Sequence, residues 1–175
     1  MQKFLTLLLL VVLMISCFVR NAAWQNDATL WLDAAKKSPN KPRGYNEIGL
    51  FHIDRHEYQK AFEPLMLSLK LNPYQPTIYI NLGLAYEGVG LPDKAMDAYQ
   101  RVISMNPDDP TAYYNLGLIY YNLKNDRARA LELLLQARDR NPFEPDVHNY
   151  LAKIYQDMGR MDLAQEELSR YTELK

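Results

Sequence analysis

The chain is poor in the residues on which disulfide-linked or metal-stabilised folds depend. Its 175 residues include one cysteine, Cys17, and three histidines. A single cysteine excludes a disulfide framework within the chain and any zinc cluster built from cysteines. Charge of one sign is also lacking, because 20 lysines and arginines face 21 aspartates and glutamates and leave a net charge of -1. This balance excludes a strongly basic nucleic-acid binder, so no nucleic-acid partner is expected.

Motifs for catalysis are missing as well. The sequence has no phosphate-binding loop, no Gly-x-Ser-x-Gly, no His-Glu-x-x-His and no dinucleotide fingerprint. His52 and His56 have the i, i+4 spacing of metal ligands on a helix, but His56 falls at an expected turn. The carboxylate pairs Asp108-Asp109 and Glu166-Glu167 are interpreted as capping or solvated groups. We therefore expect a protein that is not an enzyme and that has no metal, cofactor or small-molecule substrate.

One long hydrophobic run is present near the start of the chain. Residues 4–19 carry no charge, with Lys3 before them and Arg20 after them. As a helix this run would span about 24 Å, slightly less than the hydrocarbon core of a bilayer. A helix that is apolar on every face is a membrane element unless it is fully buried. We predict a membrane anchor or signal-like helix over residues 1–20, with the rest of the chain on the extracytoplasmic, periplasmic side because positive charge precedes the run.

Two other fates of this segment remain open. A signal-peptidase site requires small residues at its -3 and -1 positions, and Asn21 makes the nearest option a poor one. Residues 14–17 loosely match a lipoprotein site, in which Cys17 would carry the lipid. An uncleaved anchor is the favoured interpretation.

Prolines recur at a constant interval through the rest of the chain. Pro39, Pro73, Pro107 and Pro142 are separated by 34, 34 and 35 residues. Five further columns repeat in the same step: Tyr45, Tyr79, Tyr113 and His148; Ile48, Leu82, Leu116 and Leu151; Gly49, Gly83, Gly117 and Ala152; His52, Tyr86, Tyr120 and Tyr155; and Ala61, Ala95, Ala130 and Ala164.

These columns predict two helices in each unit. The first four columns are spaced i, i+3, i+4 and i+7, which is one face of a helix. The glycine or alanine among them stands where two helices would approach closely. An Asn-Pro pair then ends the second helix, because the residue before proline leaves the α region and proline cannot continue the hydrogen-bond ladder.

This pattern resembles the tetratricopeptide repeat (TPR), a 34-residue helix–turn–helix unit. The resemblance covers four units, residues 42–75, 76–109, 110–144 and 145–175, and residues 21–41 would form a capping half-repeat before them. It implies an all-α fold, a TPR α-solenoid in which helical hairpins wind into a right-handed superhelix, here behind an N-terminal transmembrane helix.

The joint between the apolar run and the repeats carries a second resemblance. Its residues are Arg20-Asn21, Trp24, Asp27, Thr29-Leu30-Trp31, Asp33, Lys37-Ser38-Pro39-Asn40, Arg43, Asn46 and Ile48-Gly49. The segment looks like the one that follows the last membrane helix of bacterial polytopic proteins with TPR tails, some of which resemble transmembrane O-mannosyltransferases. In that family the tail faces the non-cytoplasmic side and the catalytic residues lie in membrane-domain loops. No such loop is in this sequence, so no catalytic residue is carried over.

Positions on the first helix of each unit that packing does not need form the candidate partner-binding groove, on the concave side of the solenoid. They are Arg43, Asn46, Thr77, Asn81, Thr111, Tyr114, Asn115, Leu118, Tyr121, Asn122, Asn149 and Lys153. Asn81 and Asn115 share one column, which resembles the asparagine array of O-GlcNAc transferase, whose amides grip a peptide backbone. The alternative is that these amides bond neighbouring helices or water. Tyr114 and Tyr121 are expected to offer an aromatic wall.

The expected function is that of a non-catalytic, membrane-anchored scaffold. It would bind an extended or helical segment of an envelope partner in the concave groove and the lipid bilayer through residues 4–19. One alternative is that the chain is the C-terminal TPR tail of a polytopic membrane glycosyltransferase. Another is a TPR lipoprotein adaptor in pilus or cell-wall assembly, acylated at Cys17.

Overall fold

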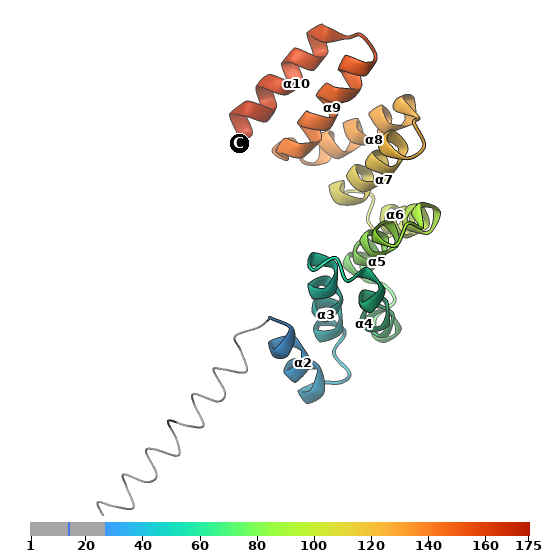
Figure 1. Ribbon diagram of the computed structural model, residues 1–175, viewed down its shortest axis with the longest axis vertical. Helices are drawn as coiled ribbons and strands as arrows, with labels where there is room; N and C mark the ends of the chain where they lie inside the picture. The colour runs from blue at the N-terminus through green and yellow to red at the C-terminus, as the bar shows by residue number, and fades with distance from the viewer. Residues whose placement is uncertain (1–13, 15–26) are drawn as a thin grey trace, which may run out of the picture. The chain divides into compact units, whose positions relative to one another are not determined.

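The computed structural model describes Met14 and residues 27–175 of the chain. Over residues 27–175 it contains nine helices and no strand (Figure 1). They are α2 (Asp27–Lys37), α3 (Pro42–Asp54), α4 (Tyr58–Leu71), α5 (Pro76–Gly88), α6 (Pro92–Met105), α7 (Pro110–Asn122), α8 (Arg127–Arg140), α9 (Pro145–Asp157) and α10 (Met161–Leu174). The helices belong to two compact units, residues 1–73 with α2 to α4 and residues 74–175 with α5 to α10.

Prolines set the ends of these helices. A proline occupies the first turn at the start of α3, α5, α7 and α9, where its missing N–H removes no hydrogen bond. Asparagine is the residue that ends α4, α6 and α8, at Asn72, Asn106 and Asn141, and each precedes a proline. The prediction that Asn-Pro ends the second helix is therefore confirmed, because proline disfavours the α conformation at the residue before it.

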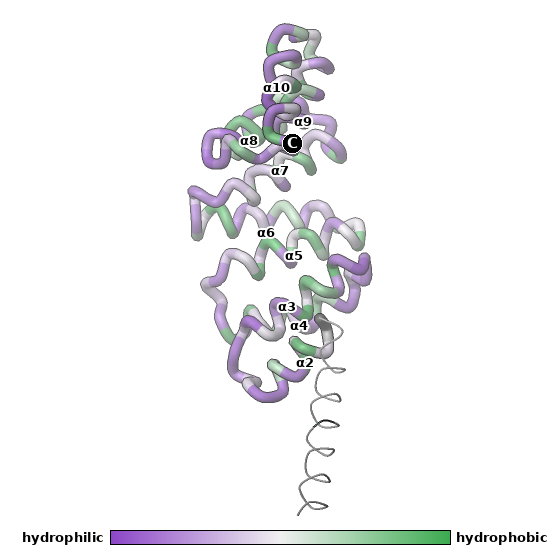
Figure 2. Tube along the Cα trace, turned by 90° about the vertical axis from the view of Figure 1, so that its left-hand side faces the viewer, coloured by the Kyte–Doolittle hydropathy of each residue, from purple (hydrophilic) through white to green (hydrophobic). Residues whose placement is uncertain are grey.

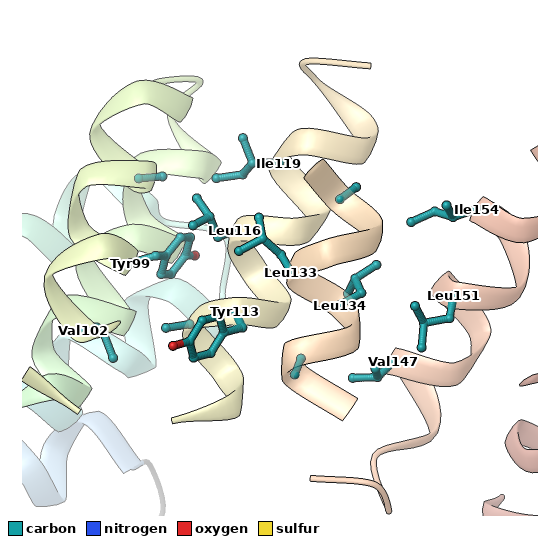
Figure 3. Packing of buried hydrophobic residues seen from close by; sticks show 14 of the residues in the cluster. Tyr99, Val102, Tyr113, Leu116, Ile119, Leu133, Leu134, Val147, Leu151 and Ile154 are labelled. Atoms are coloured by element: carbon teal, nitrogen blue, oxygen red, sulfur yellow. The ribbon is translucent and has the colours of Figure 1, made fainter. Parts of the chain in front are cut away.

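The second unit is a stack of three helix pairs with one continuous core. Within it, α5 packs on α6, α7 on α8 and α9 on α10, and the α6–α7 and α8–α9 contacts join the pairs. Tyr99, Leu134 and Leu151 are fully buried in this core, which extends from α6 to α10 (Figure 3). Figure 2 shows apolar and polar residues interspersed along the helices, as expected where helices bury part of their surface and expose the rest.

Glycine permits the close approach of the two helices in a pair. A Cβ atom added to Gly83 of α5 would lie 2.5 Å from Cζ of the Tyr99 ring on α6, and one added to Gly49 of α3 would lie 2.5 Å from Leu65 on α4. The Tyr99 ring has no room to move, since it is fully buried and its hydroxyl donates a 2.6 Å hydrogen bond to Glu87. Glycine is thus a steric requirement of these two hairpins, α3–α4 and α5–α6.

Replacing Gly83 by alanine should lower the free energy of unfolding by about 1–3 kcal/mol, because the new methyl group overlaps the Tyr99 ring. The change is measured by urea unfolding followed by circular dichroism. Combining it with Tyr99→Leu should cost less than the sum of the two single variants, since the smaller side chain leaves space for the methyl group. Gly44→Ala is the control: its Cβ would meet Ala35 at an ordinary 3.4 Å. Additive costs in the double variant would contradict the steric account.

In the first unit α3 and α4 pack as a pair, and the buried residues between them include a serine. Ser68 on α4 is fully buried, and its hydroxyl donates a 2.8 Å hydrogen bond to the carbonyl of Pro42 at the start of α3. Helix α2 packs on α3, where Ala35 is buried beside Gly44. The serine thus places a hydrogen-bond donor against the Pro42 carbonyl, so that its own buried hydroxyl has a partner.

A buried polar cluster joins the last three helices. His148 on α9 is 1% exposed, with Nδ1 2.6 Å from the Glu167 carboxylate on α10 and Nε2 2.9 Å from the carbonyl of Pro142. Arg138 on α8 donates a 3.0 Å hydrogen bond to the other oxygen of Glu167. The interpretation of Glu167 as a solvated group was wrong: its side chain is buried, because the histidine in the aromatic column needs a polar partner inside the core. Glu166, next to it, is exposed, and Asp109 caps α7 as expected.

Glu167→Gln should lower the free energy of unfolding by roughly 3 kcal/mol, since it leaves two polar partners facing a neutral amide in a buried position. The neighbouring Glu166→Gln is the matched control and should change stability by less than about 0.5 kcal/mol, because Glu166 is exposed. Both are measured by urea unfolding at neutral pH. Equal effects of the two variants would show that the cluster contributes nothing particular to the packing of α10.

The predicted membrane segment lies outside the described residues, apart from Met14. The same is true of Cys17 and of the part of the joint before Asp27. Within residues 27–175, none of the helices is long and apolar enough to cross a membrane.

Candidate functional site

The residues predicted to line the groove divide between the two units. Arg43 and Asn46 lie on α3 in the first unit, and the others lie on α5, α7 and α9 in the second. The Arg43 guanidinium stands 5.6 Å from the Trp31 ring centroid of α2. The asparagines Asn46, Asn81 and Asn115 are only 4%, 4% and 8% exposed. Their amides therefore present little surface to a partner.

The remaining predicted residues reach the surface to different degrees. Thr77, Thr111, Asn122 and Lys153 are exposed, whereas Tyr114, Leu118, Tyr121 and Asn149 are half-buried. The backbone N–H of Thr111 donates to Asp109, so this threonine marks the capped start of α7.

Three tyrosines from α7 and α9 come together in the second unit. Tyr150 on α9 packs edge-on against Tyr114, with ring centroids 6.0 Å apart, and against Tyr121, with centroids 6.3 Å apart. We call Tyr114, Tyr121 and Tyr150 the tyrosine cluster. All three side chains are half-buried, so each contributes both to the packing of α7 on α9 and to the surface.

Charged groups border the tyrosine cluster. The Lys153 ammonium lies 4.6 Å from the centroid of the Tyr150 ring, close enough for a cation–π contact. The Tyr121 hydroxyl donates a 3.0 Å hydrogen bond to Asp157, whose carboxylate also accepts from the Arg127 Nε at 3.2 Å. Tyr121 is therefore held by a hydrogen-bonded ion pair, and Tyr150 is partly covered by the lysine.

Burial raises the pKa of the Tyr114 hydroxyl, and the nearby Asp146 carboxylate adds to this effect. The pKa of Tyr121 is raised by burial first and then by its hydrogen bond to Asp157. Both hydroxyls therefore keep their protons at neutral pH and act as hydrogen-bond donors. Within the described part of the chain, the hydroxyls of Tyr114 and Tyr150 make no hydrogen bond to another residue, so they can bond the backbone of a ligand.

Tyr150 was not among the residues predicted from the sequence. It stands 35 residues after Asn115, the same step that separates Pro107 from Pro142, so it occupies the asparagine column in the last unit. Following that column past Asn115 would have found it. The change from amide to phenol at this position is what completes the cluster.

Metal-binding groups do not gather in the described part of the chain. Among residues 27–175 there is no group of three or more histidines, cysteines and carboxylates that could hold a metal ion. His52 Nδ1 lies 2.9 Å from Glu57, and His56 Nδ1 lies 2.7 Å from the Tyr58 hydroxyl, so the two rings face different partners.

Two family models match the part of the chain that contains the tyrosine cluster. Residues 93–124 match the family described as TPR repeat, and residues 124–174 match the family described as tetratricopeptide repeat. Residues 93–174 carry tetratricopeptide repeats. The tyrosine cluster lies within these TPR matches, and the fold of the described residues is an all-α TPR solenoid. No curated protein matches the chain in sequence.

Solved structures agree on the fold. PilF of Pseudomonas aeruginosa is similar with a TM-score of 0.77 and 16% identity, over 94% of this chain and 74% of that one. TTC0263, a thermophilic TPR protein of Thermus thermophilus, has a TM-score of 0.72 and 23% identity over 84% and 80% of the two chains. YrrB, a TPR protein with an unusual peptide-binding site, has a TM-score of 0.62 and 17% identity over 85% and 76%. At these identities the similarity shows the fold alone.

Tyr150→Ala should lower the free energy of unfolding by about 3 kcal/mol, because it removes a half-buried ring that packs between α7 and α9. In a double-mutant cycle with Tyr121→Ala, the coupling energy should be about 0.5–1.5 kcal/mol, as expected for an edge-on aromatic pair. Tyr74→Ala is the control, since Tyr74 is 84% exposed. Urea unfolding gives all of these values, and a coupling energy near zero would show that the ring contact contributes nothing to stability.

Proposed function

We propose that the protein is a membrane-anchored, non-catalytic TPR module that binds an extended or helical segment of an envelope protein at the tyrosine cluster. The observation that carries this proposal is the cluster itself. Two neighbouring first helices, α7 and α9, contribute half-buried phenols, and the hydroxyls of Tyr114 and Tyr150 have no hydrogen-bond partner in the described residues.

The chemistry of the cluster suits a peptide. Tyrosine supplies a large apolar ring and one polar atom at low conformational cost, which is why it is frequent at interface hot spots. The ring edges offer apolar contact to a side chain, and a free hydroxyl offers a hydrogen bond to a backbone carbonyl. Asn149 and Leu118, both half-buried on the same two helices, would extend the surface beyond the three rings.

The TPR fold supports this assignment. YrrB, which shares the fold, is described as having an unusual peptide-binding site. We propose that the first helices of the present chain serve the same general purpose on their concave side. The buried asparagines Asn81 and Asn115 would then shape the floor of the groove, and the tyrosines would make most of the contact.

Membrane attachment is the second part of the proposal, and it is supported by the uncharged run at residues 4–19. Lipidation at Cys17 is the alternative form of attachment. The resemblance of the joint to O-mannosyltransferase-like proteins keeps open a role as the tail of a polytopic glycosyltransferase. Either alternative leaves the binding surface on α7 and α9 unchanged.

The binding proposal is tested by selecting peptides from a random display library on the full chain held in detergent micelles. Peptides selected on the wild-type protein should lose at least about tenfold in affinity for a variant with Tyr114, Tyr121 and Tyr150 all changed to alanine, because hot-spot residues each contribute more than about 1 kcal/mol. Affinity is measured by isothermal titration calorimetry or fluorescence anisotropy.

The control carries Tyr74→Ala and Phe143→Ala, two aromatics that are 84% and 75% exposed and lie in turns outside the cluster. This variant should bind the selected peptides like the wild type. Circular dichroism must show that the triple variant keeps its helices. Selected peptides that bind the folded triple variant with unchanged affinity would overturn the assignment of the site.

A further inference from the structure

A largely apolar groove runs across the first unit and shares no residue with the tyrosine cluster. It has a volume of about 460 Å³, and its apolar walls come from Leu32 of α2, from Tyr45 and Ile48 of α3, and from Pro64 and Leu67 of α4. Its polar lining is formed by His52, Gln59, Lys60 and Glu63. Leu32 and Leu67 are 46% and 37% exposed, so the groove that they line presents apolar surface to solvent.

The same groove recurs three repeats later with a different chemistry. Tyr45, Pro64 and Leu67 each stand 103 residues before their counterparts, which are His148, Glu167 and Arg170. In the second unit His148 and Arg170 border a polar hollow of about 610 Å³. In that hollow the His148 ring already has a hydrogen-bond partner in the chain, because its Nδ1 lies 2.6 Å from the Glu167 carboxylate. In the first unit proline and leucine replace this glutamate and arginine.

In the third repeat, residues 110–144, an arginine covers the equivalent tyrosine. Tyr113 occupies the column of Tyr45, and the Arg140 guanidinium lies 4.0 Å from its ring centroid while bonding the Pro107 carbonyl at 2.7 Å. At the position of Arg140, α4 carries Leu71. The first repeat thus has Pro64 and Leu67 where the last has Glu167 and Arg170, and Leu71 where the third has Arg140. These apolar side chains favour an apolar occupant of the groove.

We infer that this groove receives part of the chain's own apolar run, residues 4–19, whenever that run is outside a bilayer. The run has 16 residues without charge and is almost wholly apolar, and the groove would remove several of its side chains from water. Such docking shields the hydrophobic segment from water while it is outside lipid and releases it when lipid is present.

The connection is long enough for this arrangement. The chain leads from residue 26 directly into α2, which is one wall of the groove. The seven residues 20–26 span up to about 23 Å when extended, whereas a helix with its side chains is about 10–12 Å across. Met14, the one described residue of the run, is 65% exposed.

The single native cysteine lies inside the run and makes the test direct. Leu67→Cys places a second thiol in the groove, and Met66→Cys places one on the same helix at an exposed position that does not line the groove. The full chain is made by cell-free synthesis without lipid, at nanomolar concentration, and oxidised with copper phenanthroline. Non-reducing electrophoresis then measures the rate of disulfide formation with Cys17, with and without phosphatidylcholine–phosphatidylglycerol vesicles.

Docking predicts that Leu67→Cys forms an intramolecular disulfide about tenfold faster than Met66→Cys, because the groove raises the effective concentration of the two thiols. Vesicles should suppress this disulfide. A second pair, Met14→Cys with Cys17→Ser, covers another register of the run. Equal rates for the groove and control positions in both registers, or disulfides formed only between two chains, would overturn the inference.

A disulfide that persists in the presence of vesicles would support docking and would instead contradict the membrane anchor of the proposed function. The peptide-binding test on α7 and α9 does not depend on this groove. The two proposals can therefore fail separately.

Discussion

The close approach of two helices within each hairpin is the constraint on which the rest of the structure depends. Gly83 meets the Tyr99 ring and Gly49 meets Leu65, at distances that leave no space for a methyl group. This contact fixes which face of each helix is buried and, through the 3.6-residue period, which face is left for other uses. The tyrosine cluster exists because α7 and α9 bring rings together on a face that the hairpin contacts do not use.

Residues at equivalent positions of the four repeats can differ in side-chain chemistry and in their contacts. One column holds Tyr45, Tyr79, Tyr113 and His148, and three of these have different surroundings. Tyr113 is covered by Arg140 and His148 is bonded by Glu167, whereas Tyr45 borders an open groove. A repeat scaffold tolerates such changes because each unit contacts only its neighbours, so a substitution in one groove leaves the others unaffected. Both proposed sites arise where one repeat has a residue of different chemistry from its counterparts in other repeats.

Much of the fold was predictable from local rules. Proline at the start of a helix and asparagine before proline at its end act within a few residues, so their positions alone indicate where many of the helices from α3 to α9 begin or end. The site was predictable only in part. Tyr114 and Tyr121 were identified as surface aromatics, but Tyr150 was missed because it stands in a column that the two preceding repeats fill with asparagine. Glu167 was misjudged because sequence alone does not distinguish it from Glu166, although Glu167 lies on the buried face of α10 and Glu166 on the exposed face.

The sequence by itself determined the repeat length, the proline-marked helix ends and the packing columns, since these follow from backbone chemistry and from periodicity along one chain. Only the tertiary structure decided which polar residues are buried and which aromatics meet. Asn46, Asn81 and Asn115 are buried although they lie outside the packing columns, and Tyr150 joins two tyrosines from another helix. Such outcomes depend on how two helices rotate against each other, and a rotation of one helical position exchanges an exposed residue for a buried one.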